Sequence, residues 1–245
     1  MRKDIKAPFT DHLEELRNRL IACIIAVVIG FILTYAFKDK LFEVLMGPLT
    51  PLLKEGGDSM IFTSLPEAFF TYLKVSLLAG VMIAAPVIFY HFWMFTAPGL
   101  YTNERKLMLP IVCLSSFFFL GGALFGYFVV FPFGFKFFLS FSTDAIRPML
   151  SMKDYLNFSA KLLLAFGLVF ELPLVLTFLA KLGIVTVPFL RKNRKYALVI
   201  FFIGSAILTP PDVISQVMMA FPLMLLYEIS IWGAILFGKK KVEDD

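Results

Sequence analysis

Long apolar runs alternate with short charged segments along this 245-residue chain. A helix needs about 20 apolar residues to cross the hydrocarbon layer of a bilayer. The runs predict membrane helices at Leu20–Phe37, Phe69–Phe95, Leu107–Phe138, Tyr155–Leu182, Tyr196–Leu208 and Val213–Phe237. The pattern therefore predicts an all-α polytopic membrane protein with six transmembrane helices. We expect a single integral membrane domain over residues 1–245, with a charged segment at 1–19 and a tail at 238–245.

The fifth run, Tyr196–Leu208, is shorter than the others. About 13 residues of helix extend only roughly 20 Å, less than the thickness of a normal bilayer. The turn Thr209-Pro-Pro-Asp212 joins it to the sixth run with almost no loop, which predicts a thin last hairpin. Prolines remove backbone hydrogen bonds and bend helices, and they stand at positions 86, 132, 173 and 222. Bent helices of unequal length favour a concave bundle.

The distribution of Lys and Arg predicts the orientation of the helices, because cytoplasmic loops are enriched in these residues. With six spans, 15 of the 23 Lys and Arg residues fall on the side that holds both termini, and 8 fall on the other side. Both termini are therefore expected in the cytoplasm. The net charge of +5 reflects this bias and does not indicate binding to nucleic acid. The run at Lys38–Ala68 is expected to form a structured extracytoplasmic cap with short amphipathic pieces.

Composition supports the membrane class and gives no sign of catalysis. Hydrophobic residues make up 59% of the chain and charged residues 17%, with a mean hydropathy of +0.84. The sequence contains no P-loop, no HExxH, no DDxxD and no GxSxG motif. Cys23 and Cys113 fall inside apolar runs and are interpreted as packing residues. We expect no enzyme activity, no cofactor and no metal site.

Glu171 is the single ionisable residue in a long apolar stretch, and Lys161 and Lys181 each stand ten residues away. Ten residues of helix span about 15 Å, so neither lysine neutralises the carboxylate locally. A charge near the bilayer centre costs at least about 2.5–3.5 kcal/mol, which disfavours a lipid-facing position. Two interpretations remain open: a functional group in a protein-lined or wet cavity, and a protonated acid bonded to a neighbouring helix.

Two charged segments outside the apolar runs contain carboxylates. Glu15 precedes Arg19 by four residues, the spacing of an intrahelical ion pair. Glu104 stands at the expected start of the third helix, where the helix dipole favours a negative charge. Each carboxylate therefore has a structural explanation as well as a functional one. Arg191-Lys-Asn-Arg-Lys195 is interpreted as a positive-inside anchor.

Five motifs in order carry a family resemblance. They are Thr10-x-His-Leu-x-Glu-Leu-Arg-x-Arg-Leu20, Ala97-Pro-Gly-Leu-Tyr-x-x-Glu-Arg105, Tyr127-Phe-Val-Val-Phe-Pro132, Phe166-Gly-x-x-Phe-Glu-x-Pro173 and Leu208-Thr-Pro-Pro-Asp212. Their order and spacing resemble the TatC family, the multispanning receptor subunits of the twin-arginine protein translocase. The resemblance runs essentially from residue 8 to residue 238.

The resemblance implies a receptor and scaffold that binds paired-arginine signal peptides and organises the single-span partners TatA and TatB. Folded precursors would then be exported with energy from the proton gradient. It further implies a multi-pass protein of the bacterial cytoplasmic membrane, in contact with lipid and forming a homo-oligomer in the receptor complex. The resemblance assigns signal-peptide contacts to Glu15, Glu104, Phe95, Arg17 and Arg105. It assigns partner or groove positions to Glu171, His91, Pro48, Asp212 and Gln216.

Carboxylates suit recognition of arginine, because a guanidinium donates two parallel hydrogen bonds to a carboxylate and a lysine ammonium does not reproduce that geometry. At His91 some relatives have glutamine, and a helix-interface hydrogen bond is the other interpretation of this residue. The alternative function is an ion-coupled secondary transporter that uses Glu171, since intramembrane carboxylates often serve as ion sites.

Overall fold

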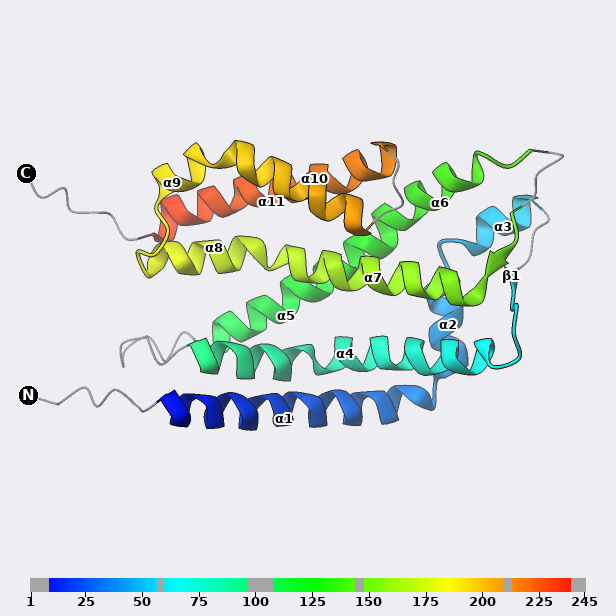
Figure 1. Cartoon of the computed structure of the whole chain (residues 1–245), viewed down its shortest axis with the longest axis horizontal. Helices are drawn as coiled ribbons and strands as arrows, with labels where there is room; N and C mark the ends of the chain where they lie inside the picture. Colours follow the sequence, from blue (N-terminus) through cyan, green and yellow to red (C-terminus); the bar gives the residue numbers. More distant parts are fainter. Residues whose placement is uncertain (1–8, 57–59, 97–107, 144–147, 209–212, 239–245) are drawn as a thin grey trace, which may run out of the picture. The chain divides into compact units, whose positions relative to one another are not determined.

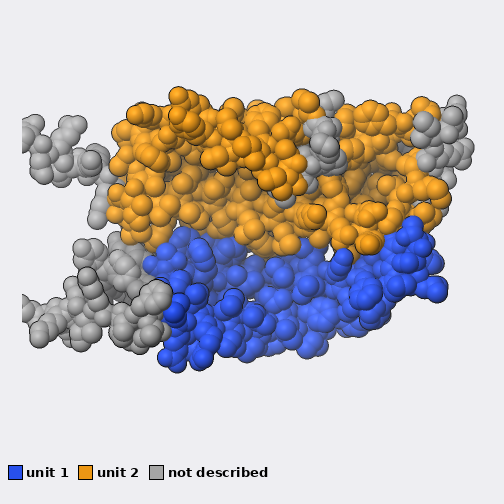
Figure 2. Space-filling model, viewed as in Figure 1, with its two compact units in different colours: residues 1–46, 62–117 blue, residues 47–61, 118–245 orange. Residues whose placement is uncertain are grey.

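The computed structural model describes residues 9–56, 60–96, 108–143, 148–208 and 213–238, and helices dominate it (Figure 1). The chain divides into two compact units, which Figure 2 colours separately. Unit 1 comprises Met1–Met46 and Phe62–Phe117, and unit 2 comprises Gly47–Ile61 and Phe118–Asp245.

Unit 1 is built on two long helices, α1 (Phe9–Tyr35) and α4 (Glu67–Thr96), which pack along each other. The short helix α2 (Lys38–Met46) and the first part of α5 (Met108–Phe125) complete the unit. Within the described part of the chain, α1 starts well before the predicted Leu20. The charged motif around Glu15 is therefore helical and continuous with the first membrane span.

Glycines bring the backbones of α1 and α4 together. A Cβ atom on Gly80 would lie 2.6 Å from the backbone nitrogen of Phe31, and one on Gly30 would lie 2.6 Å from the carbonyl oxygen of Gly80. Both distances are shorter than any real Cβ contact, so only glycine fits this crossing. Thr34 adds a polar link, because its Oγ1 donates to the carbonyl oxygen of Ser76 at 2.7 Å. Small residues thus supply the close packing that helices in lipid depend on.

A buried polar contact also joins α4 to α5. Trp93 Nε1 donates to Ser115 Oγ at 2.8 Å, and both side chains are buried. At the other end of α4, Tyr72 packs edge-on against Phe42 of α2 with ring centroids 5.8 Å apart.

Unit 2 contains the rest of α5 and every later element. In chain order its elements are α3 (Thr50–Gly56), β1 (Met60–Ile61), the π-helical segment η3 (Gly126–Val130), α6 (Phe131–Leu139), β2 (Leu150–Ser151), α7 (Met152–Phe170), α8 (Leu172–Lys181), α9 (Val187–Lys192), α10 (Arg194–Leu208) and α11 (Val213–Phe237). The two strands pair in parallel, with Met60 opposite Leu150 and Ile61 opposite Ser151. The prediction of short structured pieces in the segment Lys38–Ala68 is confirmed by α2, α3 and β1.

Two of the four prolines mark interruptions of their helices. Pro132 follows η3, where the backbone shifts to a wider turn and Phe131 N–H bonds to the carbonyl of Gly126. Pro173 begins α8, which is separated from α7 by Glu171 alone. Each proline lacks the N–H that a continuous helix requires, so the chain changes its hydrogen-bond pattern just ahead of it. Pro86 and Pro222 lie inside helices without such an interruption.

Close packing in unit 2 also depends on glycine. A Cβ atom on Gly122 of α5 would overlap the carbonyl oxygen of Phe166 and lie 2.8 Å from Cβ of Phe170, both on α7. Only glycine therefore fits at position 122, where α5 packs on α7.

Within the described residues, five helical stretches are long and apolar enough to cross a membrane: His12–Tyr35, Glu67–Thr96, Met108–Leu139, Met152–Lys181 and Met219–Phe237. The helix α10 has 15 residues, and at about 1.5 Å per residue it extends only some 22 Å. The prediction of a short fifth helix is confirmed. The count of six spans and the cytoplasmic location of both termini stay predictions.

Candidate functional site

The first candidate site lies where the start of α1 meets the last turn of α4, in unit 1. His12 of α1 stacks on Phe95 of α4, with ring centroids 4.4 Å apart and the ring planes 20° from parallel. His12 is exposed and Phe95 is half-buried. The contact joins two residues that are more than 80 positions apart in the sequence.

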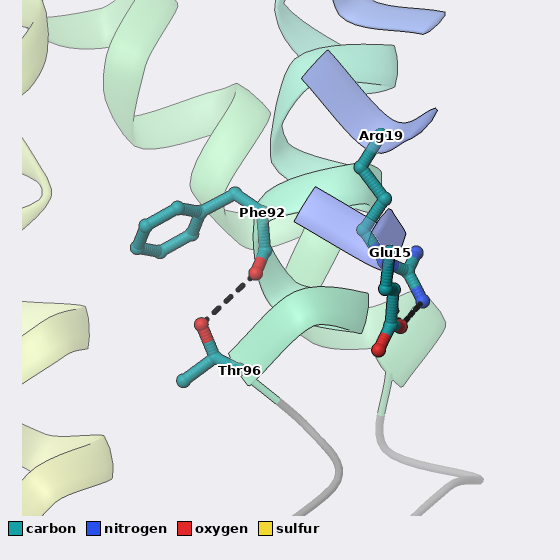
Figure 3. Close-up of polar contacts among 4 residues, drawn as sticks. All are labelled: Glu15, Arg19, Phe92 and Thr96. Atoms are coloured by element: carbon teal, nitrogen blue, oxygen red, sulfur yellow. Dashed lines mark hydrogen bonds and ion pairs between the residues drawn. The ribbon is translucent and has the colours of Figure 1, made fainter. Parts of the chain in front are cut away.

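Glu15 lies one helical turn after His12 and pairs with Arg19 (Figure 3). Arg19 Nε donates to Oε1 of Glu15 at 2.9 Å, and Arg19 Nη2 contacts the same oxygen. The side chain of Glu15 retains 36% of its exposure and that of Arg19 retains 19%. The predicted intrahelical pair is therefore confirmed, and it leaves the carboxylate partly open to solvent.

The last turn of α4 is ordered beside this pair (Figure 3). Thr96 Oγ1 donates to the carbonyl oxygen of Phe92 at 2.9 Å, one turn back in the same helix. This bond supports the turn that holds Phe95. The loop that follows, with Glu104 and Arg105, lies outside the described residues.

Arg17 does not join the Glu15 cluster. Two residues of helix rotate a side chain by about 200°, so Arg17 projects away from the face that bears Glu15. Its Nη2 is 3.9 Å from Oε1 of Glu14, and both side chains are about two-thirds exposed, at 69% and 67%. An ion pair this open to solvent contributes little to stability.

The second candidate region is in unit 2 and centres on Glu171. This residue is 7% exposed and occupies the junction between α7 and α8. Its N–H donates to the carbonyl of Leu168 at 3.1 Å, and its carbonyl accepts from Val175 N–H at 2.9 Å. The carboxylate is thus buried against protein, as the cost of a lipid-facing charge predicts.

His91 of α4, in unit 1, is partly buried and meets Tyr90 edge-on at 5.4 Å. Its Nδ1 atom is buried and has no hydrogen-bond partner among the residues that the structure describes. The alternative of a helix-interface hydrogen bond is therefore not realised through this atom.

Gln216 is the polar position of the last hairpin that the structure describes. Its Nε2 donates to the carbonyl oxygen of Phe202 at 2.9 Å and so ties α11 to α10. It also borders a pocket of about 460 Å³ whose other lining residues are apolar and belong to α10. Asp212 and its turn lie outside the described residues.

Pro48 lies in the turn before α3 and is partly exposed. The next residue, Leu49, is 1% exposed and lines an apolar cavity of about 260 Å³ together with Phe135, Phe158 and others. Pro48 therefore fixes the backbone at the point where α3 is anchored in unit 2. Among the described residues, no group of three His, Cys, Asp or Glu side chains could hold a metal ion.

Comparison with known proteins identifies the family. The family model described as "Sec-independent protein translocase protein (TatC)" matches residues 11–222. The TatC protein of Desulforapulum autotrophicum is 62% identical over 244 residues, which cover 100% of this chain and 90% of that protein. The chain belongs to the TatC family.

More distant relatives and solved structures agree. The TatC protein of Escherichia coli K12 is 39% identical over 225 residues, covering 92% of this chain and 87% of that protein. A crystal structure of the twin-arginine translocase receptor TatC is 44% identical, covers 92% of this chain and 98% of that chain, and superposes with a TM-score of 0.81. This TatC protein is accordingly a multi-pass membrane protein with the fold of that receptor.

Sequence reasoning assigned no role to His12 of this TatC chain. The residue stands in the first family motif, three positions before Glu15, which is the spacing of neighbours on one helix face. That spacing is the signal in the sequence that places His12 on the same helix face as Glu15. The stacking partner, Phe95, came only from the packing of α1 against α4.

Proposed function

We propose that this protein is the receptor subunit of a twin-arginine translocase and binds the paired arginines of signal peptides at the α1–α4 end of unit 1. The observation that carries the proposal is the position of Glu15. Its carboxylate is partly exposed, stands one turn from an aromatic stack, and accepts a guanidinium of the chain itself, that of Arg19. Family membership supports this choice of ligand.

The chemistry favours arginine over lysine at this site. A carboxylate and a guanidinium form two parallel charge-assisted hydrogen bonds, whereas an ammonium forms only a point contact. Glu15 would accept one arginine, and Glu104 would accept the other. Arg17 and Arg105 would also contact the signal peptide, Arg17 from the exposed face of α1 that bears Glu14. Such bonds contribute roughly 1.5–3 kcal/mol each when well formed, and less where water reaches them.

The apolar part of the signal peptide would then insert along a concave face toward Glu171. A polar residue on a partner helix of the TatA or TatB type would be stabilised by this carboxylate. His91, Gln216 and Asp212 would add further polar contacts, and Pro48 would hold the segment before α3.

The distribution of Lys and Arg supports six spans with both termini in the cytoplasm, and family membership supports the cytoplasmic membrane of a bacterium. The short helix α10 would thin the bilayer locally. Several copies would assemble in the receptor complex, and export of folded precursors would draw on the proton gradient.

The decisive experiment measures binding of the purified full chain in detergent to a twin-arginine signal peptide and to its twin-lysine counterpart. Glu15→Ala and Glu104→Ala should each weaken twin-arginine binding by about tenfold or more, as loss of a charge-assisted bond predicts. Glu14→Ala is the matched control, because Glu14 is the same residue type, is adjacent in sequence and is more exposed. Equal binding by all four proteins and both peptides would contradict the proposal.

The transporter alternative makes a separate prediction. A solute carrier that uses Glu171 would move its solute in vesicles that hold this protein alone, and Glu171→Gln would abolish that flux. The receptor proposal expects transport of a folded precursor only when the single-span partners are present.

A further inference from the structure

Among the described residues near the recognition site, His12 stands out as an exposed imidazole held in a ring stack. It is exposed, yet its ring lies nearly parallel to Phe95 at a centroid distance of 4.4 Å. Such stacks contribute about 0.5–1.5 kcal/mol beyond burial of area. The stack therefore orders an exposed imidazole that would otherwise rotate freely.

The stack and the carboxylate share one face of α1. Residues three and seven positions apart on a helix lie above one another, so His12, Glu15 and Arg19 form a single stripe. Phe95 approaches this stripe from α4 and backs one face of the His12 ring. His12 is exposed in spite of this stack, and it lies about one turn from the partly exposed carboxylate of Glu15.

A guanidinium can be bound at its edge and at its flat face, and this stripe contains a side chain suited to each. Its edge donates hydrogen bonds to a carboxylate, and its flat face stacks on an aromatic ring. A lysine ammonium has no flat face to stack on the ring of His12. Arg19 shows the edge contact within the chain itself, since its donors meet Oε1 of Glu15.

On the basis of the proposed function, we propose that His12 is a specificity-determining residue of the signal-peptide site. Its ring stacks on the guanidinium of one peptide arginine while Glu15 accepts the edge of the same group. Phe95 acts as a positioning residue that holds the imidazole in the required plane. Stacking on the His12 ring thus favours binding of arginine over lysine independently of charge.

The test compares binding of twin-arginine and twin-lysine signal peptides to the purified full chain carrying substitutions at His12. His12→Ala should weaken twin-arginine binding about fivefold, the loss expected for a stacking contact at an exposed site. It should leave twin-lysine binding within about twofold, so the preference for arginine falls. His12→Phe keeps a flat ring and should retain the preference, whereas His12→Leu should lose it.

The controls separate stacking from general damage. Leu13→Ala removes an exposed neighbour and should change neither affinity. Phe95→Ala should lower the preference for the twin-arginine peptide to the level seen with His12→Ala. The double variant should bind that peptide as well as either single variant, because both substitutions disrupt the same His12–Phe95 stack.

An equal loss for both peptides, no loss in His12→Ala, or additive effects in the double variant would overturn the inference. These results are distinct from failure of the proposed function, which would appear as twin-arginine binding that ignores Glu15→Ala. If Glu15→Ala abolishes binding and the His12 variants behave like the unmodified protein, the function stands and the role of His12 does not.

Discussion

Arg19 uses two donors, Nε and Nη2, on one carboxylate oxygen of Glu15. The pair is formed within one turn of α1, so it exists before any peptide arrives. The other carboxylate oxygen of Glu15, Oε2, takes no part in this pair. The chain thus carries its own arginine at the carboxylate that we propose for an arginine of the signal peptide.

Replacing Arg19 with Gln should therefore strengthen binding of the twin-arginine peptide. The substitution removes a cation that competes for Glu15 and repels the incoming guanidinium, and we expect affinity to rise about threefold. The free energy of unfolding should fall by no more than about 0.5 kcal/mol, the worth of an i,i+4 pair. Titration with labelled peptide and thermal denaturation measure the two effects. A clear loss of affinity would instead show that Arg19 positions Glu15.

Gly80→Ala should destabilise the packing of α1 on α4. The added Cβ would lie 2.6 Å from the backbone nitrogen of Phe31 and 2.9 Å from its Cα, and backbone atoms cannot swing aside. Overpacking of this kind costs about 1–3 kcal/mol. Gly121→Ala is the matched control, because no atom lies within 4 Å of its new Cβ, and it should be neutral or slightly stabilising. Thermal unfolding of the full chain in detergent compares the two, and similar melting points would contradict the crossing seen here.

Ser115→Ala should destabilise unit 1 more than Ser116→Ala. Ser115 accepts the indole N–H of Trp93, and its loss leaves that buried donor without this acceptor, at a cost of about 1–3 kcal/mol. Ser116 donates only to the carbonyl of Val112 in its own helix, so its removal should cost little. Tryptophan emission during unfolding reports on the change directly. Equal effects from the two neighbouring serines would argue against a bond that links α4 to α5.

Glu228 and Arg194 form the ion pair that joins the start of α10 to α11 at 2.7 Å. The side chain of Arg194 is 51% exposed and that of Glu228 is 43% exposed, so water screens the pair. A double-mutant cycle with Arg194→Gln and Glu228→Gln should therefore give a coupling of about 0.5 kcal/mol, well below that of a buried pair. The coupling should shrink further in high salt. A coupling above about 2 kcal/mol would mean that the pair is shielded from solvent in the membrane-bound protein.

Much of the fold followed from local features of the sequence. The lengths of the apolar runs predicted the long helices, and the 13-residue run at Tyr196–Leu208 predicted the short helix that became α10. Pro173 predicted a disturbance of its helix, because a missing N–H acts on the chain wherever it occurs. The ends of helices were less predictable: the motif around Glu15 reads as a charged segment, yet it continues α1 back to Phe9.

The sequence by itself determined the membrane class, the family and the pair between Glu15 and Arg19, because each depends on residues close together in the chain. The tertiary structure alone decided that Phe95 stacks on His12 and that Gly80 meets Phe31. These contacts join distant positions, and their geometry depends on which helix faces meet. That choice is made by the packing of whole helices, which no local pattern encodes.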